Sequence, residues 1–387
     1  MSGPLAGTRV LEIAEGVAGP TCGLLLADLG AEVIKLESPA GDRSRGWRDD
    51  ALNYELLNRG KRGVTVDLSH PEAAALAAAL AAGCDAVIVD TDVLAAWPAL
   101  AGLADDPAQV VCRISLFGSD GPMAGLPIAE LPAQLLSEAT ASVGQPGRPG
   151  RAGVDIGSSY AGIYGAQAIL AALLANEPGT GELIEVSLVG ALMAMRSTLW
   201  VALSNPDEWW GFHLDSYYRP PFRGYECADG RVYFDLRHAA SVDWDALLDE
   251  LGLGDVRDDP RYPDLMVAGA GPGARYADAA KPIWDRAFRD RSVDSVTEII
   301  TRYGGDVFRV NTYPELLATP QVGAVGNVAP RAGQVPAHIR PPWEFSGTAL
   351  AADATAAPQL GLSARAVLAD CGASAGDVAR WTAAGLL

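Results

Sequence analysis

Basic side chains gather near the N-terminus, in two short motifs whose residue types could do chemistry. Arg43 and Arg45 stand in GDRSRGW, which Trp47 ends, and Lys61 and Arg62 stand in LNRGKRGVTVDL. Guanidinium and ammonium groups hold phosphate through charge-assisted hydrogen bonds, so the cluster indicates a site for a phosphorylated ligand. The same side chains would equally suit a solvated turn joined by salt bridges, and the sequence leaves both interpretations open.

Two carboxylates and a hydroxyl stand further along the chain, around the start of a long apolar segment. Asp155 and Ser158 lie in VDIGSSYAG, and Glu130 lies in PIAELPAQ. Asp155 could cap the following helix through its backbone N–H groups, and Glu130 is favoured by the dipole of a first helical turn. Ser158 could act as a nucleophile only with a base within hydrogen-bond reach, and the neighbouring sequence provides none.

A βαβ unit must position the basic cluster. Val10–Ile13 has the length of a buried strand, a glycine-rich turn and a helix follow, and Ala31–Leu36 and Val64–Leu68 read as two further strands. The first turn, which carries Val17 and Ala18, directs backbone N–H groups to the space above the sheet. Such a turn suits an anionic ligand.

Strands and helices continue to alternate as far as residue 205. The pattern predicts a large α/β domain over residues 1–205, with a mostly parallel, doubly wound sheet and helices on both faces. A helix at Pro71–Ala82 is expected to begin with Ser69 as its cap. The other expected strands are Asp85–Val89, Val110–Ser115 and Leu183–Leu188, and the other expected helices are Leu131–Thr140, Ser159–Asn176 and Val189–Trp200.

The second half of the chain differs in composition. Residues 206–223 are rich in aromatic residues and proline, and we interpret them as a linker between domains. Residues 224–329 predict a small α+β domain that opens with a hairpin turned at Asp229-Gly230. Residues 330–387 are rich in loops and end in a short helix at Ala375–Ala384.

Composition and charge limit the class of protein. The chain has 387 residues and a net charge of -19, which argues against nucleic acid or an anionic membrane as a partner. Five scattered cysteines favour reduced thiols over disulfides or a zinc site, and no metal is implied. With no signal pattern and no apolar run of transmembrane length, the sequence predicts a cytoplasmic protein.

The order of several motifs resembles the family III CoA-transferases. AGP, LLADLGAEVIKLE, GDRSRGW and LNRGKRGVTVDL follow one another as they do at the start of that family. The likeness recurs in ILAALL, YECADGRVYF, VNTYPELLATPQV, PWEFSGT and RWTAAGLL. It implies a large Rossmann-like domain completed by residues 330–387, a small α+β domain, two chains threaded as interlocked rings, and coenzyme A or acyl-CoA as substrate.

The same resemblance bears on the nucleophile. In the family, an aspartate early in the long middle helix attacks the acyl-CoA thioester, and an anhydride and an aspartyl-CoA thioester follow. Counting back from ILAALL places this position on Ser158, with Asp155 three residues upstream. Either a local insertion lets Asp155 reach the site, or the usual nucleophile is lost. Glu130 stands where the family has an acid, and Ala129 stands where its racemases have histidine, which disfavours racemisation.

The residues expected to contact CoA also differ from the sequence pattern of the family. Asp90 begins the segment where the family carries Asn-Phe-Arg-Pro-Gly, and Asp92 adds a second acid where an anion should approach. Like charges at short range repel, so these acids oppose CoA binding. The residues that the resemblance and the basic cluster together assign to CoA binding are Val17, Ala18, Arg43, Arg45, Trp47, Lys61, Arg62 and Asp90.

Three functions fit these departures. The first is a CoA-transferase that moves CoA between an acyl-CoA and a carboxylic acid through an enzyme carboxylate, with a degenerate site. The second is a non-catalytic subunit that forms a heterodimer with a paralogous chain. The third is a repurposed enzyme for a substrate other than a CoA thioester, with a pocket formed by Glu130, Ser158, Trp209 and Trp210.

Overall fold

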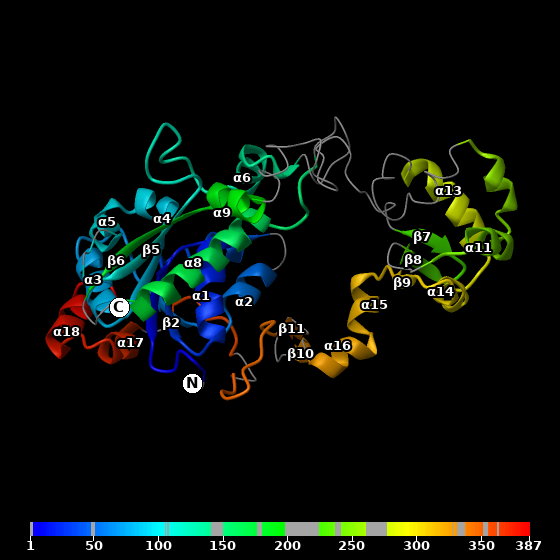
Figure 1. Cartoon of the computed structure of the whole chain (residues 1–387). Coiled ribbons are helices and arrows are strands. Elements are labelled where there is room, and N and C mark those ends of the chain that lie inside the picture. Colours follow the sequence, from blue (N-terminus) through cyan, green and yellow to red (C-terminus); the bar gives the residue numbers. More distant parts are fainter. Residues whose placement is uncertain are drawn as a thin grey trace. The chain divides into compact units, whose positions relative to one another are not determined.

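The computed structural model describes most of the chain (Figure 1). The described residues are 3–47, 51–104, 106, 108–140, 150–175, 180–197, 224–236, 241–260, 277–326, 328–330, 337–350, 355–361 and 364–387. They divide into two compact units, Met1–Arg196 with Gly326–Leu387, and Ser197–Val325. Each unit has a hydrophobic core of its own.

The first unit is built on a parallel sheet, as the sequence predicts. Within the described residues the sheet has six strands in the order β3-β2-β1-β4-β5-β6, so the order reverses between β1 and β4. In doubly wound sheets ligands bind beyond the carboxyl ends of the strands at such a reversal. The strands are β1 (Arg9–Ile13), β2 (Glu32–Glu37), β3 (Arg62–Thr65), β4 (Ala86–Asp90), β5 (Val110–Ser115) and β6 (Glu182–Ser187).

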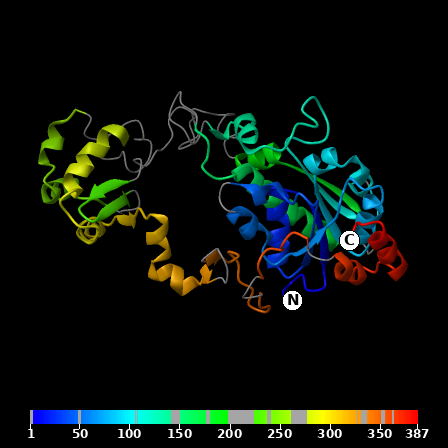
Figure 2. The same ribbon diagram turned by 180° about the vertical axis from the view of Figure 1, so that it is seen from behind.

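Helices cover both faces of this sheet. Because both faces are buried, apolar side chains of β1 point to both cores: Leu11 and Ile13 face one core and Val10 faces the other. The C-terminal helices pack beside α3 (Figure 2). The helices of the first core are α3 (Ala73–Ala82), α17 (Ala364–Asp370) and α18 (Ala375–Ala383), and those of the second are α1 (Ala18–Asp28), α6 (Glu130–Leu136), α8 (Ile156–Ala175) and α9 (Leu188–Met195).

Helix α8 is the central helix of the second core. A Cβ atom added at Gly162 would lie 2.6 Å from the carbonyl oxygen of Ala18, so glycine lets α8 approach the start of α1. Within the described residues α8 is the one helix with the length and mean hydropathy of a membrane-crossing segment. It packs against α1, β5 and α9, as the core helix of a globular unit does.

Shorter elements complete the first unit. The prediction that Ser69 caps α3 was wrong, because the helix begins at Ala73 after Glu72, and the Ser69 hydroxyl donates to Asp67 Oδ1 at 2.6 Å. The remaining elements are η1 (Arg43–Gly46), α2 (Leu52–Asn58), α4 (Thr91–Ala96), η2 (Pro98–Leu100), α5 (Ala101–Ala104) and the antiparallel pair β10 (Val328–Pro330) and β11 (Ala337–Ile339).

The second unit is a small α+β fold, as predicted. Its antiparallel sheet has the order β7-β8-β9, and β8 already begins at Gly230, so the hairpin loop is Ala228 and Asp229. Aromatic rings around Trp284 form its core, with centroids 4.7 Å from Phe234 and 6.5 Å from Tyr225. The linker predicted at 206–223, with Trp209 and Trp210, lies outside the described residues. The elements are β7 (Tyr225–Cys227), β8 (Gly230–Asp235), α11 (Trp244–Leu251), η3 (Gly254–Asp258), α13 (Ala277–Phe288), α14 (Val293–Arg302), β9 (Asp306–Arg309), α15 (Tyr313–Leu317) and α16 (Pro320–Val325).

Candidate functional site

The carboxylate of Glu130 lies at the N-terminus of α8. Its Oε1 accepts hydrogen bonds from the Gly157 N–H at 2.9 Å and from the Gln134 side chain at 2.8 Å. Its Oε2 accepts the Ser158 N–H at 2.9 Å and the Ser158 hydroxyl at 2.8 Å. The first turn of a helix leaves its N–H groups without partners and favours negative charge. Glu130 is the first residue of α6, and its side chain caps the N-terminus of α8.

This contact supplies the base that sequence reasoning did not find for Ser158. Glu130 and Ser158 are 28 residues apart in the chain, and α6 brings the carboxylate to the hydroxyl. Ser158 is only 6% exposed and Glu130 is half-buried, and a hydrogen bond to a charged acceptor is stronger than one between neutral groups. The chain thus places a carboxylate and a hydroxyl in direct contact at the start of α8.

Asp155 has a different environment. Its carboxylate pairs with Arg151 at 2.8 Å, and the two side chains are 30% and 53% exposed. Its backbone carbonyl accepts the Ser159 N–H at 2.9 Å. The N–H groups of Gly157 and Ser158, which a capping side chain would satisfy, bond to Glu130 instead.

The turn between β1 and α1 lies at the reversal of the sheet order. The Glu15 N–H donates to Asp90 Oδ2 at 2.8 Å, and the Gly16 N–H donates to Asp42 Oδ1 at 3.0 Å. Asp90 also caps α4 through the Val93 N–H at 2.7 Å. Two donors of the turn are therefore bound by carboxylates of the chain itself, at a place where related folds hold a ligand anion.

Burial sets the electrostatics of this turn. Asp90 is 1% exposed, and burial raises its pKa to about 7 although the Val93 and Glu15 N–H groups oppose the shift. Gly16 has φ +77°, and a Cβ atom there would lie 2.9 Å from Arg43 Nε. The Arg43 side chain thus lies close to the backbone of Gly16, and its Nη1 pairs with Asp92 Oδ2 at 2.9 Å.

Val17 and Ala18 stand at the N-terminus of α1, which packs against α8. Ala18 contacts α8 at Gly162, which is four residues, or about one helical turn, beyond Ser158. The start of α1 therefore lies against the first two turns of α8, the helix whose N-terminal residue Ser158 binds Glu130. Asp90 and Arg43 approach the same turn at Glu15 and Gly16, the two residues before Val17.

The remaining basic residues have partners inside the fold. Arg45 forms two hydrogen bonds with Glu37, both 2.8 Å, and Arg62 pairs with Glu32 and with Asp370. The Lys61 side chain is fully buried, and burial lowers its pKa to about 8 although Glu12 opposes the shift. Trp47 is partly buried and ends η1.

No group of three or more histidine, cysteine, aspartate or glutamate side chains in the described part of the chain could hold a metal ion.

Known proteins resemble this chain over nearly its whole length. The succinate–glutarate CoA-transferase of Agrobacterium fabrum is 30% identical over 393 residues, which cover 95% of each chain. The succinyl-CoA–D-citramalate CoA-transferase of Chloroflexus aurantiacus is 28% identical over 82% of this chain and 81% of its own. A CAIB/BAIF family protein from Brucella suis has a similar fold, with a TM-score of 0.78, 26% identity and coverage of 96% of this chain and 100% of that one.

The family model of CoA-transferase family III matches residues 5–364. With that match and the full-length relatives, the chain belongs to CoA-transferase family III.

Proposed function

We propose that this protein moves CoA between an acyl-CoA thioester and a carboxylic acid, with Glu130 as the attacking carboxylate. One observation carries the proposal: Glu130 Oε2 lies 2.8 Å from the Ser158 hydroxyl, at the position where the family resemblance expects an aspartate. The carboxylate is supplied from α6 instead of from α8 itself. The site is divergent in sequence and retains the group that the chemistry needs.

Energetics favour a carboxylate over the serine as nucleophile. A glutamyl anhydride or glutamyl thioester keeps enough transfer potential to pass the acyl group or CoA on. A serine ester is more stable, and its attack by an acceptor carboxylate would have to form an anhydride and expel an alkoxide. Acylation of Ser158 would therefore lead to hydrolysis, and transfer of CoA to an acid needs a carboxylate such as that of Glu130.

The surrounding donors suit two successive steps. Glu130 Oε2 attacks the thioester carbonyl, the CoA thiolate leaves, and a mixed anhydride forms. The thiolate then attacks the glutamyl carbonyl carbon, the original acyl group departs as a carboxylate, and a glutamyl-CoA thioester remains. Oε1 carries negative charge during the second attack, and the Gly157 N–H and the Gln134 amide already point at it. An acceptor carboxylate reverses both steps.

The names of the relatives guide the choice of test substrates. The two CoA-transferases compared above act on succinate, glutarate and citramalate by name, and each of these acids has two carboxylates. We therefore take succinyl-CoA as donor and glutarate as acceptor. The acid that this chain uses is expected to belong to the same class of short dicarboxylic acids.

The test is to trap the covalent intermediate. The protein is mixed with succinyl-CoA and quenched with hydroxylamine, which converts an activated carboxyl into a hydroxamate that peptide mass spectrometry can locate. We expect the hydroxamate on Glu130, and we expect Glu130→Gln to lower CoA transfer by at least about 10³-fold. Asp155→Asn is the matched control and should retain transfer within a few-fold.

Other outcomes would favour the other functions. A hydroxamate on Asp155 would assign that residue as the nucleophile. An isolated chain without transfer activity that becomes active with a second chain would indicate a non-catalytic subunit of a heterodimer. Absence of CoA binding in calorimetry would favour a repurposed enzyme with a different substrate.

A further inference from the structure

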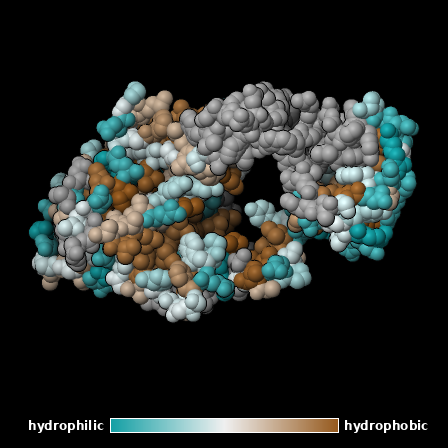
Figure 3. Space-filling view, viewed as in Figure 1, coloured by the Kyte–Doolittle hydropathy of each residue, from teal (hydrophilic) through white to brown (hydrophobic). Residues whose placement is uncertain are grey.

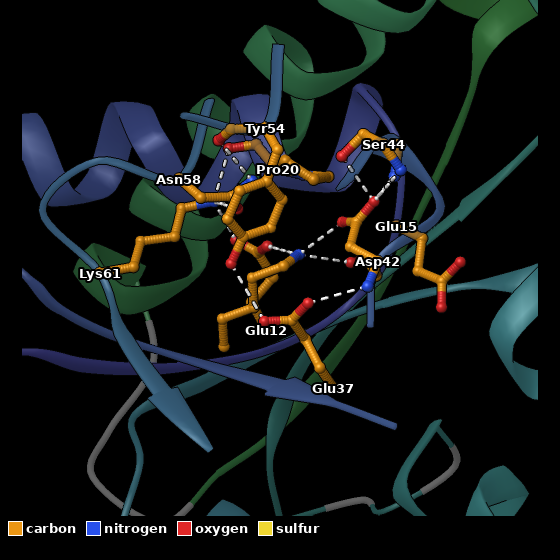
Figure 4. A network of polar contacts seen from close by, with 12 residues as sticks. Glu12, Glu15, Pro20, Glu37, Asp42, Ser44, Tyr54, Asn58 and Lys61 are labelled. Atoms are coloured by element: carbon orange, nitrogen blue, oxygen red, sulfur yellow. Dashed lines mark hydrogen bonds and ion pairs between the residues drawn. The ribbon is translucent and has the colours of Figure 1, made fainter. Parts of the chain in front are cut away.

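A buried network of charged side chains lies on the sheet beneath α1 (Figure 4). Glu12 on β1, Lys35 on β2 and Lys61 before β3 have no exposed side-chain surface. Lys35 Nζ contacts Glu12 Oε1 at 2.8 Å and Asp42 Oδ2 at 2.9 Å, and Lys61 Nζ contacts Glu12 Oε2 at 2.7 Å. Two acids and two lysines balance their charges. Asn58 adds an oxygen 2.9 Å from Lys61 Nζ.

Three members of this network also bind the backbone of the β1–α1 turn. Lys35 Nζ donates to the carbonyl oxygen of Ala14 at 2.8 Å, before the turn. Asp42 Oδ1 accepts the Gly16 N–H at 3.0 Å, within it. Lys61 Nζ donates to the carbonyl oxygen of Pro20 at 2.9 Å, in the first turn of α1. The network therefore forms hydrogen bonds with the backbone of this segment at three points, namely Ala14, Gly16 and Pro20.

We propose that Glu12, Lys35, Asp42 and Lys61 are positioning residues that fix the β1–α1 turn for the CoA substrate. The inference rests on the proposed function, because it takes Val17 and Ala18 as contacts of the CoA thioester. These two residues lie between Gly16 and Pro20, inside the segment that the network binds, and Ala18 approaches α8 at Gly162, about one helical turn from Ser158. The network thus orients one wall of the site without touching the substrate.

Burying these charges contributes little net stability, and this favours a role in fixing the conformation of the turn. Desolvating an ion pair offsets most of the attraction that it gains, and apolar side chains of equal volume are often as stabilising. Apolar side chains cannot bind the oxygens of Ala14 and Pro20 or the Gly16 N–H, however. The charges therefore specify one conformation of the turn, which an apolar core would leave undefined.

The surrounding sequence is adapted to the network. A Cβ atom added at Gly23 would lie 1.9 Å from Glu12 Oε2, so glycine is required where α1 covers the acid. Burial opposes the charge of Asp42, yet Lys35 and the donors of Ser44 and Gly16 outweigh it and hold the pKa of Asp42 at about 2. Glu37 Oε1 accepts the Asp42 N–H at 2.8 Å and fixes the loop that carries it.

The test removes one opposite-charge pair from the full-length protein. In Glu12→Gln/Lys61→Met the net charge is unchanged, and Lys35 keeps Asp42 as its partner. We expect the KM for succinyl-CoA to rise at least about 10-fold, with the KM for glutarate changed less than about twofold, because displacement of a substrate-holding segment weakens its own ligand. Equal changes in the two KM values, or none, would overturn the proposal.

A matched control is a second buried ion pair, at the other end of α1. Arg59 pairs with Asp28 of α1 at 2.7 Å, both side chains are largely buried, and neither contacts the turn. Asp28→Asn/Arg59→Met removes a buried ion pair of the same kind and should therefore leave the ratio of the two KM values as it is in the wild type. If Glu12→Gln/Lys61→Met does not fold, Asp42→Asn takes its place, because it removes charge and keeps an oxygen for the Gly16 N–H.

A second readout does not depend on catalysis. Hydrogen exchange of a peptide covering residues 14–21 reports the order of the turn in the free protein. The network variant should exchange faster in this peptide than the wild type, and the control variant should not. Faster exchange in a chain without transfer activity would reject the proposed function alone, and unchanged exchange would reject the positioning role.

Discussion

At the scale of single residues, the contact between Ser158 and Glu130 decides which of them can react. The hydroxyl donates to a carboxylate that already accepts two backbone N–H groups and one amide. A carboxylate has about four acceptor positions, so Glu130 is fully hydrogen-bonded at rest. One of these bonds must open for Oε2 to attack, and the Ser158 hydroxyl is the donor that can rotate.

Ser158→Ala therefore separates the two candidate nucleophiles. If Glu130 attacks the thioester, the variant loses one supporting hydrogen bond, and kcat/KM for transfer from succinyl-CoA to glutarate should change by less than about 10-fold. Steady-state kinetics of the variant beside Glu130→Gln measures the difference. A loss as large as that of Glu130→Gln would show that the hydroxyl itself takes part in the reaction.

Asp90 gives a second prediction at this scale, for stability against pH. Its pKa is about 7 in the folded chain, above the ordinary value of 3.8, and burial is the main cause. Between pH 4 and 7 the folded protein therefore holds a proton that the unfolded chain has released. The Asp90 contribution to the free energy of unfolding is present at low pH and is lost as the pH rises through about 7.

Urea unfolding at pH 5 and at pH 8 can isolate this contribution. Burial also raises the pKa of Asp28 to about 6, so the wild type is compared with Asp90→Asn and not judged alone. The wild type should lose more stability than Asp90→Asn between the two pH values. An equal loss in both proteins would contradict a raised pKa at Asp90.

At the scale of elements, the crossing of α1 and α8 sets the geometry of the candidate site. Gly162→Ala would place a Cβ atom 2.6 Å from both the Ala18 carbonyl oxygen and Thr21 Cβ, so the helices must move apart. Overpacking of this kind costs about 1–3 kcal/mol. We expect urea unfolding to show this loss, and kcat to fall with it, because Val17 precedes α1 and because α8 carries Ser158, which binds Glu130.

A control for Gly162→Ala lies in α5. A Cβ atom at Gly102 would meet nothing within 4 Å, so Gly102→Ala should leave the free energy of unfolding unchanged or raise it by up to about 1 kcal/mol. If both variants were equally stable, the close approach at Gly162 would not constrain the two helices.

Much of the element order could be read from the sequence, since local patterns encode it. β5 has the predicted bounds, Val110–Ser115, because an apolar run with branched residues fits a buried strand. α17 was missed, because ARAVLAD is short and lies after a loop-rich segment, and its helix depends on packing against the sheet.

The candidate site was less predictable than the elements. A sequence shows that Lys61 is charged and cannot show that it is buried against Glu12, so phosphate binding and salt bridges both stayed open for it. Likewise, Ser158 has no base near it in the chain, and Glu130 reaches it only because α6 packs against α8. Residue types are local information, and the pairing of distant side chains is created by packing.

At the scale of the whole molecule, large apolar side chains are exposed in each of the two units. In the second unit Phe308, Tyr313 and Leu317 are 57%, 80% and 47% exposed, on β9 and α15. In the first unit Leu174 of α8 is 89% exposed, and hydrophobic residues gather on the face that Figure 3 shows. Apolar patches of this kind in soluble proteins commonly mark contacts between chains.

We expect the isolated protein to be a homodimer whose two chains are interlocked, as the family resemblance implies. Light scattering after gel filtration should then give about twice the chain mass of 40.3 kDa. A dimer held only by an apolar interface dissociates on dilution, since its stability depends on protomer concentration. Interlocked rings cannot separate without unfolding, so the doubled mass should persist at nanomolar concentration.

Subunit exchange distinguishes the arrangements further. When tagged and untagged dimers are mixed, interlocked chains should form mixed dimers only after denaturant has unfolded them, because exchange must wait for the slow unfolding step. Rapid exchange in native buffer would mean that the chains merely touch. A monomer that dimerises only with a paralogous chain would instead favour the heterodimer, and Glu130 would then need its activity measured in that complex.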